Sequence, residues 1–472
     1  MSPLEQEKRL HDLARHLRGR LIGPRHPDWE EARSPWNLRV DQRPVAVVDA
    51  AGADDLAATA AFAARNGLQV TVQATGHGAG DVLDNTILIR TRRLRGITVD
   101  PARGRAVVGA GVRCNDLLAA AGPHGLVLST GSAPDAGVAG YAMFGGVGRL
   151  GRTLGFTAGQ VLAADVVTAD GSRVRADEEA HADLLWALRG GGGGFALVTQ
   201  LELRLARLPG LFGGELIWPV DAAPEVFGAW RAWTGSVPRE MNSSAYVIEL
   251  PPLPEIPEVL RGRRVTGVMA CYAGPADEGA ALLKPLTEVG TPLLDTCRPL
   301  SPADLVTLLA APAAPLPSRI RSALLHQLPE AAISEFLRHI MPGSGSPLVV
   351  EVRHLGGAYA DPAGGYPDPS AGRMNGAGAI GHTSAQFLVE LASMIPAPEA
   401  DAGARAFQET AIGALGPWST GMTLPGFAPP PADAGQVFTA ETQLRLAEVK
   451  HRYDPAGIIR SSFPITPRQG PR

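Results

Sequence analysis

The sequence predicts an α+β protein built of two lobes, and three observations carry this prediction. At 472 residues the chain exceeds the usual size of one domain, so we expect more than one hydrophobic core. From about residue 40 to 205, many short strand patterns alternate with a few helical ones, which indicates one α+β unit. After Pro209 the composition changes. Proline-rich stretches lie at 251–257, 311–317 and 362–369, with helical patterns between them. A separate second lobe is the simplest explanation.

The first lobe is expected to open with a helix and to continue as a β-α-β unit. Leucines at helical spacing predict the opening helix over 4–22, namely Leu10, Leu13, Leu17 and Leu21. The β-α-β unit is expected as a strand at 45–48, a helix at 54–66 and a strand at 68–72. Further strand patterns lie at 86–89, 97–100, 106–108, 161–168, 174–175 and 195–205, with a short helix at 115–121 capped by Asn115. Towards the C-terminus, 356–378 predicts a long surface loop and 443–453 a helix.

Charge and cysteine content exclude several classes of partner. The formal net charge is −4, so there is no basic surplus for binding nucleic acid or an anionic membrane. The three cysteines, Cys114, Cys271 and Cys297, are widely spaced and predict neither a disulfide framework nor a metal site. The N-terminus lacks the apolar core of a signal peptide, and no segment reaches the apolar length of a membrane span. We therefore expect a soluble, cytoplasmic protein.

The most informative motif is a histidine inside a glycine-rich turn, Thr75-Gly76-His77-Gly78-Ala79-Gly80, directly after the strand pattern 68–72. Glycines let the backbone approach a ligand and direct N–H groups at phosphate. A phosphate cradle has no need of an imidazole at its centre, whereas a cofactor attached covalently through that imidazole does. Taken alone, the motif favours a surface turn that happens to contain a histidine, by about two to one.

Two more glycine-rich segments favour the ligand interpretation. One runs from Gly131 to Gly151, and the other is the five-glycine stretch Gly190–Gly194. Gly146, Gly148 and Gly151 match GxGxxG, but no strand directly precedes them, so a Rossmann site is not expected. Three close-approach loops in one lobe indicate a large ligand with a central pyrophosphate, bound mainly by backbone N–H groups. FAD fits this description.

The order of these motifs resembles that of the FAD-linked oxidases of the vanillyl-alcohol-oxidase/p-cresol-methylhydroxylase fold, in particular the berberine-bridge-enzyme-like family. The matching stretches are Trp36-Asn37, Arg43-Pro44, Ala74–Gly78, the 131–151 loop, Val166–Gly171, Asp183–Gly193 and Glu448–Pro455. The resemblance implies a two-lobed FAD-binding fold whose substrate lobe is an antiparallel sheet flanked by helices. It implies an FAD-binding domain over 1–208 with its core at about 40–205, a substrate-binding domain over 209–420, and a C-terminal segment, 421–472, that returns to the FAD domain.

The resemblance also assigns roles to residues of the loops. In relatives, the histidine at the position of His77 bonds to the C8 methyl carbon of the flavin, and some members add a cysteine at the position of Ala133. We therefore expect FAD bound covalently through one histidine only. The position that relatives use to control oxygen access is Ala136, a small residue that favours an oxidase. The remaining positions expected to contact FAD are Thr75, Gly76, Gly78, Ala79, Gly80, Ser132, Gly137, Gly140, Tyr141, Gly145, Gly146, Gly190, Gly191 and Val198.

The resemblance does not supply a catalytic base, because the Tyr-x-Asn element of many relatives is absent from 436–440. The strand pattern 348–355 offers Glu351 as a base, its pKa raised by burial, and Arg353 to hold an anionic or enolic substrate oxygen. An ordinary cross-strand ion pair explains these two residues equally well. Tyr246 is a weaker candidate on the strand 245–250.

Three functions remain open at this point. The first is an oxidase that transfers hydride from a small organic substrate (an alcohol, a sugar or a polyketide-type intermediate of secondary metabolism) to flavin N5 and then electrons to molecular oxygen. The second is an oxygenase that acts through an oxygenated flavin on a polyketide-like carbonyl compound. The third is a flavin-binding protein whose catalytic machinery has decayed. The sequence leaves the substrate and the oligomeric state open.

Overall fold

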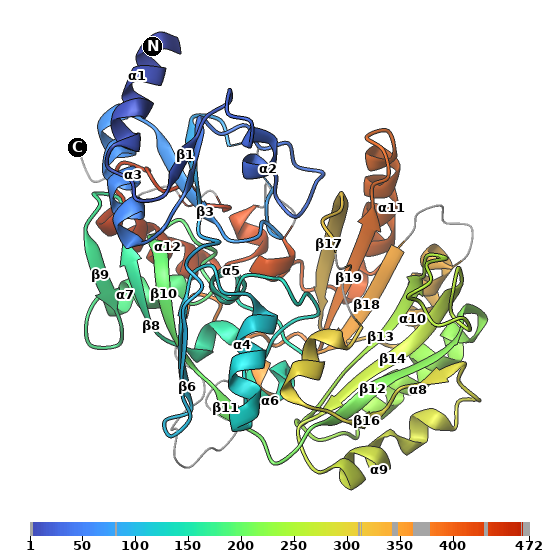
Figure 1. Cartoon of the computed structure of the whole chain (residues 1–472). Coiled ribbons are helices and arrows are strands. Elements are labelled where there is room, and N and C mark those ends of the chain that lie inside the picture. Colours follow the sequence, from blue (N-terminus) through green and yellow to red (C-terminus); the bar gives the residue numbers. More distant parts are fainter. Residues whose placement is uncertain are drawn as a thin grey trace.

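A computed structural model of the chain describes residues 3–80, 83–309, 312, 314–341, 348–361, 378–428, 433–463 and 465. The N-terminal half forms one lobe that contains two sheets, and residues 212–394 contribute a third, larger sheet in a second lobe (Figure 1). Among the described residues, no helix is long and apolar enough to cross a membrane. The mixed helix-and-sheet architecture with two lobes is the one that the sequence predicts. The domain boundaries at 208 and 420 stay predictions.

The first sheet is built around the expected β-α-β unit. Its strands follow the order β1-β2-β4-β3, in which β2, β4 and β3 are parallel and β1 is an antiparallel edge. Helix α3 (Ala53–Asn66) connects β2 to β3 and ends at Gly67, whose φ of 65° is the left-handed conformation that glycine adopts most easily. The strands are β1 (Arg20–Ile22), β2 (Ala46–Asp49), β3 (Gln69–Gln73) and β4 (Thr86–Arg90). This arrangement places the turn 74–80 at the carboxyl end of β3.

The second sheet is antiparallel, in the order β5-β6-β10-β8-β9. Its strands are β5 (Ile97–Asp100), β6 (Arg105–Gly109), β8 (Val161–Val167), β9 (Arg173–Ala176) and β10 (Leu197–Arg204). A short pair, β7 (Leu126–Val127) and β11 (Ala206–Arg207), lies beside it. The helices of this lobe are α1 (Pro3–Ala14), α2 (Trp29–Arg33), α4 (Cys114–Ala121), α5 (Val138–Met143), α6 (Gly151–Leu154) and α7 (Ala182–Leu188).

The third sheet is the antiparallel sheet of the second lobe, in the order β15-β12-β14-β13-β18-β19-β17, with β16 paired to β12. Helices cover the face that points away from the first lobe (Figure 1), and their apolar side chains share one core with that face. The strands are β12 (Phe212–Pro219), β13 (Met241–Glu249), β14 (Arg264–Tyr272), β15 (Leu294–Asp295), β16 (Arg298–Pro299), β17 (Ser318–Leu325), β18 (Leu348–His354) and β19 (Phe387–Met394). The helices are α8 (Ala223–Thr234), α9 (Ala276–Thr287), α10 (Glu330–Ile340) and α11 (Ala400–Ala414).

The C-terminal segment lies against the first lobe. Helix α12 (Ala440–Tyr453) packs on α7, and the chain beyond it forms a parallel bridge between Ile459 and Val70 of β3. The buried Lys450 donates hydrogen bonds to the carbonyl oxygens of Gly194 and Ile459 at 2.6 and 2.7 Å. These contacts bring residues 460–463 next to the turn that follows β3.

Two local predictions were wrong, and one lies outside the described residues. The opening helix ends at Ala14 rather than near residue 22, because Leu21 joins β1 opposite Val48. Asp55 holds the chain between α1 and β1 by accepting hydrogen bonds from the backbone N–H groups of residues 18 and 19. Helix α4 begins at Cys114, so Asn115 lies inside the helix and does not cap it. Most of the surface loop expected over 356–378 falls in 362–377, which the structure does not describe.

Candidate active site

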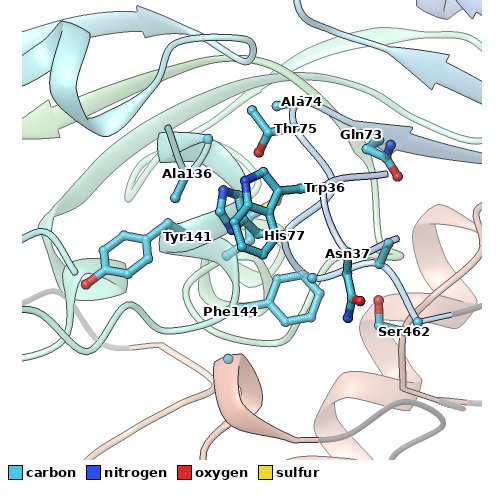
Figure 2. A pocket seen from close by; sticks show the side chains of 18 of the residues that line it. Trp36, Asn37, Gln73, Ala74, Thr75, His77, Ala136, Tyr141, Phe144 and Ser462 are labelled. Carbon is cyan, nitrogen blue, oxygen red and sulfur yellow. The ribbon is translucent and has the colours of Figure 1, made fainter. Parts of the chain in front are cut away.

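A cavity of about 420 Å³ lies where the first lobe, the third sheet and the C-terminal segment meet. The turn after β3 and the loop before α5 form much of its wall, and Figure 2 shows their side chains around it. Strand β17 contributes Ser318, Arg319 and Ile320, while the C-terminal part contributes 425–428 and 460–463. The cavity is therefore enclosed by segments far apart in the sequence.

His77 lies in the wall of this cavity, in a turn that other segments hold in place. Gly76 has a φ of 90°, and a Cβ at this position would lie 2.8 Å from Pro35, so only glycine fits. The Trp36 N–H donates to the carbonyl oxygen of Thr75 at 3.1 Å. The Trp36 ring stacks on the His77 imidazole, with centroids 4.2 Å apart and planes inclined by 20° (Figure 2).

The imidazole has a second neighbour in the loop before α5. His77 Nε2 lies 2.8 Å from Asp135 Oδ1, and each of these side chains is 23% exposed. Burial acts to raise the pKa of Asp135, but the hydrogen bond and the charge interaction with His77 outweigh it and lower that pKa. Asp135 is therefore held as a carboxylate beside the imidazole.

The loop before α5 brings its backbone close to the turn. A Cβ on Gly137 would lie 2.8 Å from the Ala74 Cβ, so the two loops touch at this glycine. A Cβ on Gly78 or Gly140 would meet no atom within 4 Å, because these glycines border open space at the cavity. Ala136 and Tyr141 also line the cavity, and Figure 2 shows the Tyr141 hydroxyl pointing away from His77.

The cavity fits FAD in its polar groups as well as in its glycines. Several residues that line it carry a buried side-chain atom without a hydrogen-bond partner in the described chain, among them Trp36 Nε1, Gln42 Oε1 and Gln73 Nε2. Such atoms usually bond to a ligand or water. Arg39 and Arg460 also line the cavity and supply positive charge for a pyrophosphate, which the sequence alone assigned mainly to backbone N–H groups. Arg319 lines the cavity as well but is paired with Asp401.

Most of the predicted FAD contacts lie at this cavity, and a few do not. Those that line it are Thr75, Gly76, His77, Gly78, Ala79, Gly80, Ala136, Gly137, Gly140, Tyr141, Gly146 and Val198. Those absent from its lining are Ser132, Ala133, Gly145, Gly190 and Gly191. A Cβ on Gly145 or Gly190 would lie 2.2 or 2.5 Å from Ile380, and one on Gly191 would lie 2.3 Å from the Ala187 carbonyl oxygen. These three glycines therefore make room for the chain itself.

The structure places the three predicted catalytic side chains behind the cavity wall. Glu351 is buried, and its two oxygens accept hydrogen bonds from Arg149 at 2.7 Å and Arg353 at 2.8 Å. Burial acts to raise its pKa, but the charges of Arg353 and Arg149 lower it overall, opposite to the expected direction. Tyr246 donates to Glu215 at 2.7 Å, and burial raises its pKa well above the ordinary value. The ion-pair interpretation therefore describes Glu351 and Arg353 better.

A carboxylate that the sequence analysis missed lies next to this pair. Glu390 of β19 is directly opposite Glu351 and bonds Arg353 at 2.8 Å, and its side chain is 15% exposed. Burial and the charge of Glu351 raise its pKa, although Arg353 opposes the shift. Ser322, opposite Glu390 on β17, donates to the carbonyl oxygen of Phe427, a residue of the cavity wall. The sequence signal that could have identified Glu390 is that it is the single charged residue in the otherwise largely apolar strand Phe387–Met394.

Comparison with known proteins agrees with this geometry. The family described as FAD binding domain matches residues 44–177. A curated relative, (R)-6-hydroxynicotine oxidase of Paenarthrobacter nicotinovorans, is 33% identical over 43% of this chain and 45% of its own length. The alignment thus spans less than half of that relative.

Solved structures match over nearly the whole chain. The structure of 6-hydroxy-D-nicotine oxidase from Arthrobacter nicotinovorans superposes with a TM-score of 0.78 and 24% identity, covering 96% of this chain and 98% of that one. Berberine-bridge-enzyme-like 1 of Physcomitrella patens gives a TM-score of 0.82 and 19% identity over 98% and 100% of the two chains.

The fold and the matched domain define a flavoprotein class. The chain carries an FAD binding domain within the vanillyl-alcohol-oxidase type of fold, shared with berberine-bridge-enzyme-like oxidases, so the predicted resemblance is confirmed. Its relatives are FAD-linked oxidoreductases, which is the enzyme class expected from the motifs.

Proposed function

We propose that this protein is an FAD-dependent oxidase of a small organic substrate, with its flavin attached to His77. The observation that carries the proposal is the cavity itself, in which a histidine on a left-handed glycine turn faces a space bordered by Gly78 and Gly140. When bound, FAD supplies hydride acceptance at N5 and reoxidation by molecular oxygen. The protein positions the flavin and its substrate and removes a proton from the substrate.

The chain's own residues divide this work. Arg39 and Arg460 offer charge to the phosphates, and Gln42 and Gln73 offer hydrogen bonds to a polar ligand. The small side chain of Ala136 leaves room for oxygen at the cavity. The substrate enters from the side of β17 and residues 425–428, which also line the cavity. An alcohol, a sugar or a polyketide-type intermediate is small enough for such a site.

Glu390, which like Glu351 lies outside the cavity lining but within the described part of the chain is bonded through one oxygen only, is the proton acceptor in this proposal. Its raised pKa lies nearer to neutral pH than that of Glu351, and one of its oxygens is without a recorded partner in the described residues. Glu351 serves instead to fix Arg149 and Arg353, because both of its oxygens are bonded. A carboxylate with a raised pKa is the better general base near neutral pH.

Paired glutamine substitutions test the assignment of the base. We expect Glu390→Gln to lower kcat/KM by about 10²- to 10⁴-fold, the usual contribution of a general base. In the wild type, activity falls as the pH drops through the pKa of Glu390, because the protonated acid accepts no proton; this limb lies above the ordinary glutamate value of about 4.3. Glu390→Gln removes the limb.

Glu351→Gln is the matched control, since it makes the same chemical change one strand away. It keeps a pH limb but moves it to lower pH, because the charge of Glu351 is one of the causes that raise the pKa of Glu390. It lowers the free energy of unfolding by about 3 kcal/mol, since Arg149 loses its buried partner. Full activity with an unchanged pH limb in Glu390→Gln would remove Glu390 from the mechanism.

The reaction itself is tested by anaerobic mixing with alcohols, sugars, amines and polyketones. Bleaching of the flavin absorbance identifies substrates, and one hydrogen peroxide per product on admitting oxygen is the result expected of an oxidase. The absence of Tyr-x-Asn from 436–440 and the small Ala136 also favour a second candidate, an oxygenase. Label from ¹⁸O₂ in the product would identify that activity. Bound flavin that no compound bleaches would contradict both and support a decayed enzyme.

A further inference from the structure

The side chain of His77 is held on two sides before any cofactor is considered. The Trp36 ring covers one face of the imidazole, at 4.2 Å between centroids. The Asp135 carboxylate lies at its edge, 2.8 Å from Nε2. Figure 2 shows Trp36 and His77 one behind the other in the cavity wall. A histidine that only needed to reach a ligand would require neither neighbour.

Asp135 is itself positioned by the backbone around it. The Cys114 N–H donates to the carbonyl oxygen of Ala136 at 2.9 Å, and the Asn115 N–H donates to that of Pro134 at 2.9 Å. These bonds flank Asp135 on both sides and tie its loop to the first turn of α4. The carboxylate is therefore presented to His77 by a rigid support.

This contact decides which imidazole nitrogen carries the proton. An ionised carboxylate only accepts hydrogen bonds, so Nε2 must be the donor and bear the hydrogen. In the neutral ring the lone pair then resides on Nδ1. Within the described residues, no hydrogen bond to Nδ1 of His77 is recorded, so that lone pair is available for reaction.

We infer that Asp135 is a positioning residue that holds His77 as the Nε2–H tautomer and thereby makes Nδ1 the atom that bonds to the flavin. This inference rests on the proposed covalent site. One bond forms between Nδ1 and the C8 methyl carbon, and one C–H bond of that methyl breaks. Its electron pair passes through the isoalloxazine to oxygen, which also takes one proton from the methyl group and one from the imidazole and leaves as hydrogen peroxide. The Asp135 carboxylate stabilises the positive charge that the alkylated ring carries until its Nε2 proton leaves.

The test uses the purified full-length protein and two matched aspartate variants. Asp135→Asn keeps the shape but removes the charge, and its amide can also donate to Nε2 and favour the wrong tautomer. Asp116→Asn is the control, a half-buried aspartate in the first turn of α4 that pairs with Arg95 at 2.6 Å. The covalent fraction is followed by intact mass and by fluorescence of the denatured band while FAD is added in air.

The expected result has three parts. Asp135→Asn binds FAD but attaches it at least about tenfold more slowly than the wild type, as loss of a tautomer-fixing carboxylate predicts. Asp116→Asn attaches FAD at the wild-type rate, and Asp135→Glu recovers part of it. The flavin peptide from digested wild-type protein matches a synthetic 8α-(Nδ1-histidyl)flavin, rather than the Nε2 isomer, by NMR.

Other outcomes overturn the inference. Wild-type linkage through Nε2, or attachment at the wild-type rate in Asp135→Asn, contradicts it directly, and the linkage test needs no variant to fold. FAD that is bound without a covalent bond in the wild type, with substrate oxidation intact, removes the inference and the tether but leaves the proposed oxidase activity standing. A folded wild-type protein that binds no FAD removes both.

Discussion

At residue 77, the surroundings explain how a flexible turn presents a reactive side chain. Gly76 adopts a positive φ against Pro35, Trp36 stacks on the ring, and Asp135 binds its edge. Pro35 and Trp36 belong to one segment and Asp135 to another, and together these contacts fix both the position and the orientation of the imidazole. Orientation matters because covalent attachment requires one particular nitrogen to face the cofactor.

The small side chain of Ala136 predicts rapid reoxidation of the reduced flavin by oxygen. Ala136→Val adds two methyl groups at the cavity wall, and we expect it to slow reoxidation of the reduced flavin by oxygen about tenfold, or 1.4 kcal/mol of barrier. Stopped-flow mixing of reduced protein with oxygenated buffer measures this rate. Ala136→Gly, which opens the site further, should keep the wild-type rate; a valine variant that reoxidises as fast as wild type would show that oxygen approaches elsewhere.

The sequence identified the residues of the cavity that belong to local motifs and missed those that depend on tertiary packing. His77, Gly137 and Gly140 stand out because a histidine or a cluster of glycines is unusual within a single loop. The partnership of Trp36 and Asp135 with His77 was not predicted, because it joins segments more than forty residues apart. Glu390 was missed because its role depends on the strand that pairs with it.

At the scale of elements, the five-glycine segment is explained by the C-terminal segment. A Cβ on Gly192 would lie 2.3 Å from the Phe463 ring, and one on Gly194 would lie 2.5 Å from Ser461. The glycines therefore let residues 461–463, which line the cavity, pass close to the first lobe. Lys450 fastens this arrangement, because its ammonium group bonds the Gly194 carbonyl and the Asp454 carboxylate.

Removal of this ammonium group should loosen the C-terminal segment. Lys450→Met keeps the length of the side chain but leaves Asp454 buried without its cation, and we expect a loss of about 3 kcal/mol in the free energy of unfolding. Denaturant titration followed by tryptophan fluorescence measures it. Lys284→Met, an exposed lysine on α9, should change stability by less than about 0.5 kcal/mol. Equal stability of the two variants would contradict this role for Lys450.

Periodicity predicted the elements well where local and tertiary preferences agree. The β-α-β unit, both hairpins of the first lobe and α12 lie within a few residues of their expected positions. The opening helix was overextended because leucines at helical spacing continue to Leu21, whereas pairing with β2 takes that residue into a strand. Strand β18 was predicted, but its sequence left a catalytic role and an ion pair open for Glu351 and Arg353, because the partner Arg149 lies 202 residues away from Glu351.

In the whole molecule, the buried Arg149 and Arg152, which follow α5 in the chain, connect the first lobe to the second. Arg149 donates to Glu351 and to the Leu308 carbonyl oxygen at 2.7 and 3.0 Å. Arg152 donates through Nε to the Met241 carbonyl oxygen at 2.8 Å. The loop that carries Asp135 and Ala136 thus continues directly into the contact between lobes. A sequence cannot reveal this connection, because the partners lie about 90 to 200 residues away.

The central proposal for the whole molecule is the covalent bond between His77 and the flavin. Acid denaturation of the purified wild-type protein beside His77→Ala tests this bond most directly. We predict that the wild type keeps its flavin after denaturation, with the mass of one attached FAD, and that His77→Ala releases any flavin it has bound. Flavin released from the wild type, or retained by His77→Ala, would contradict the assignment of His77.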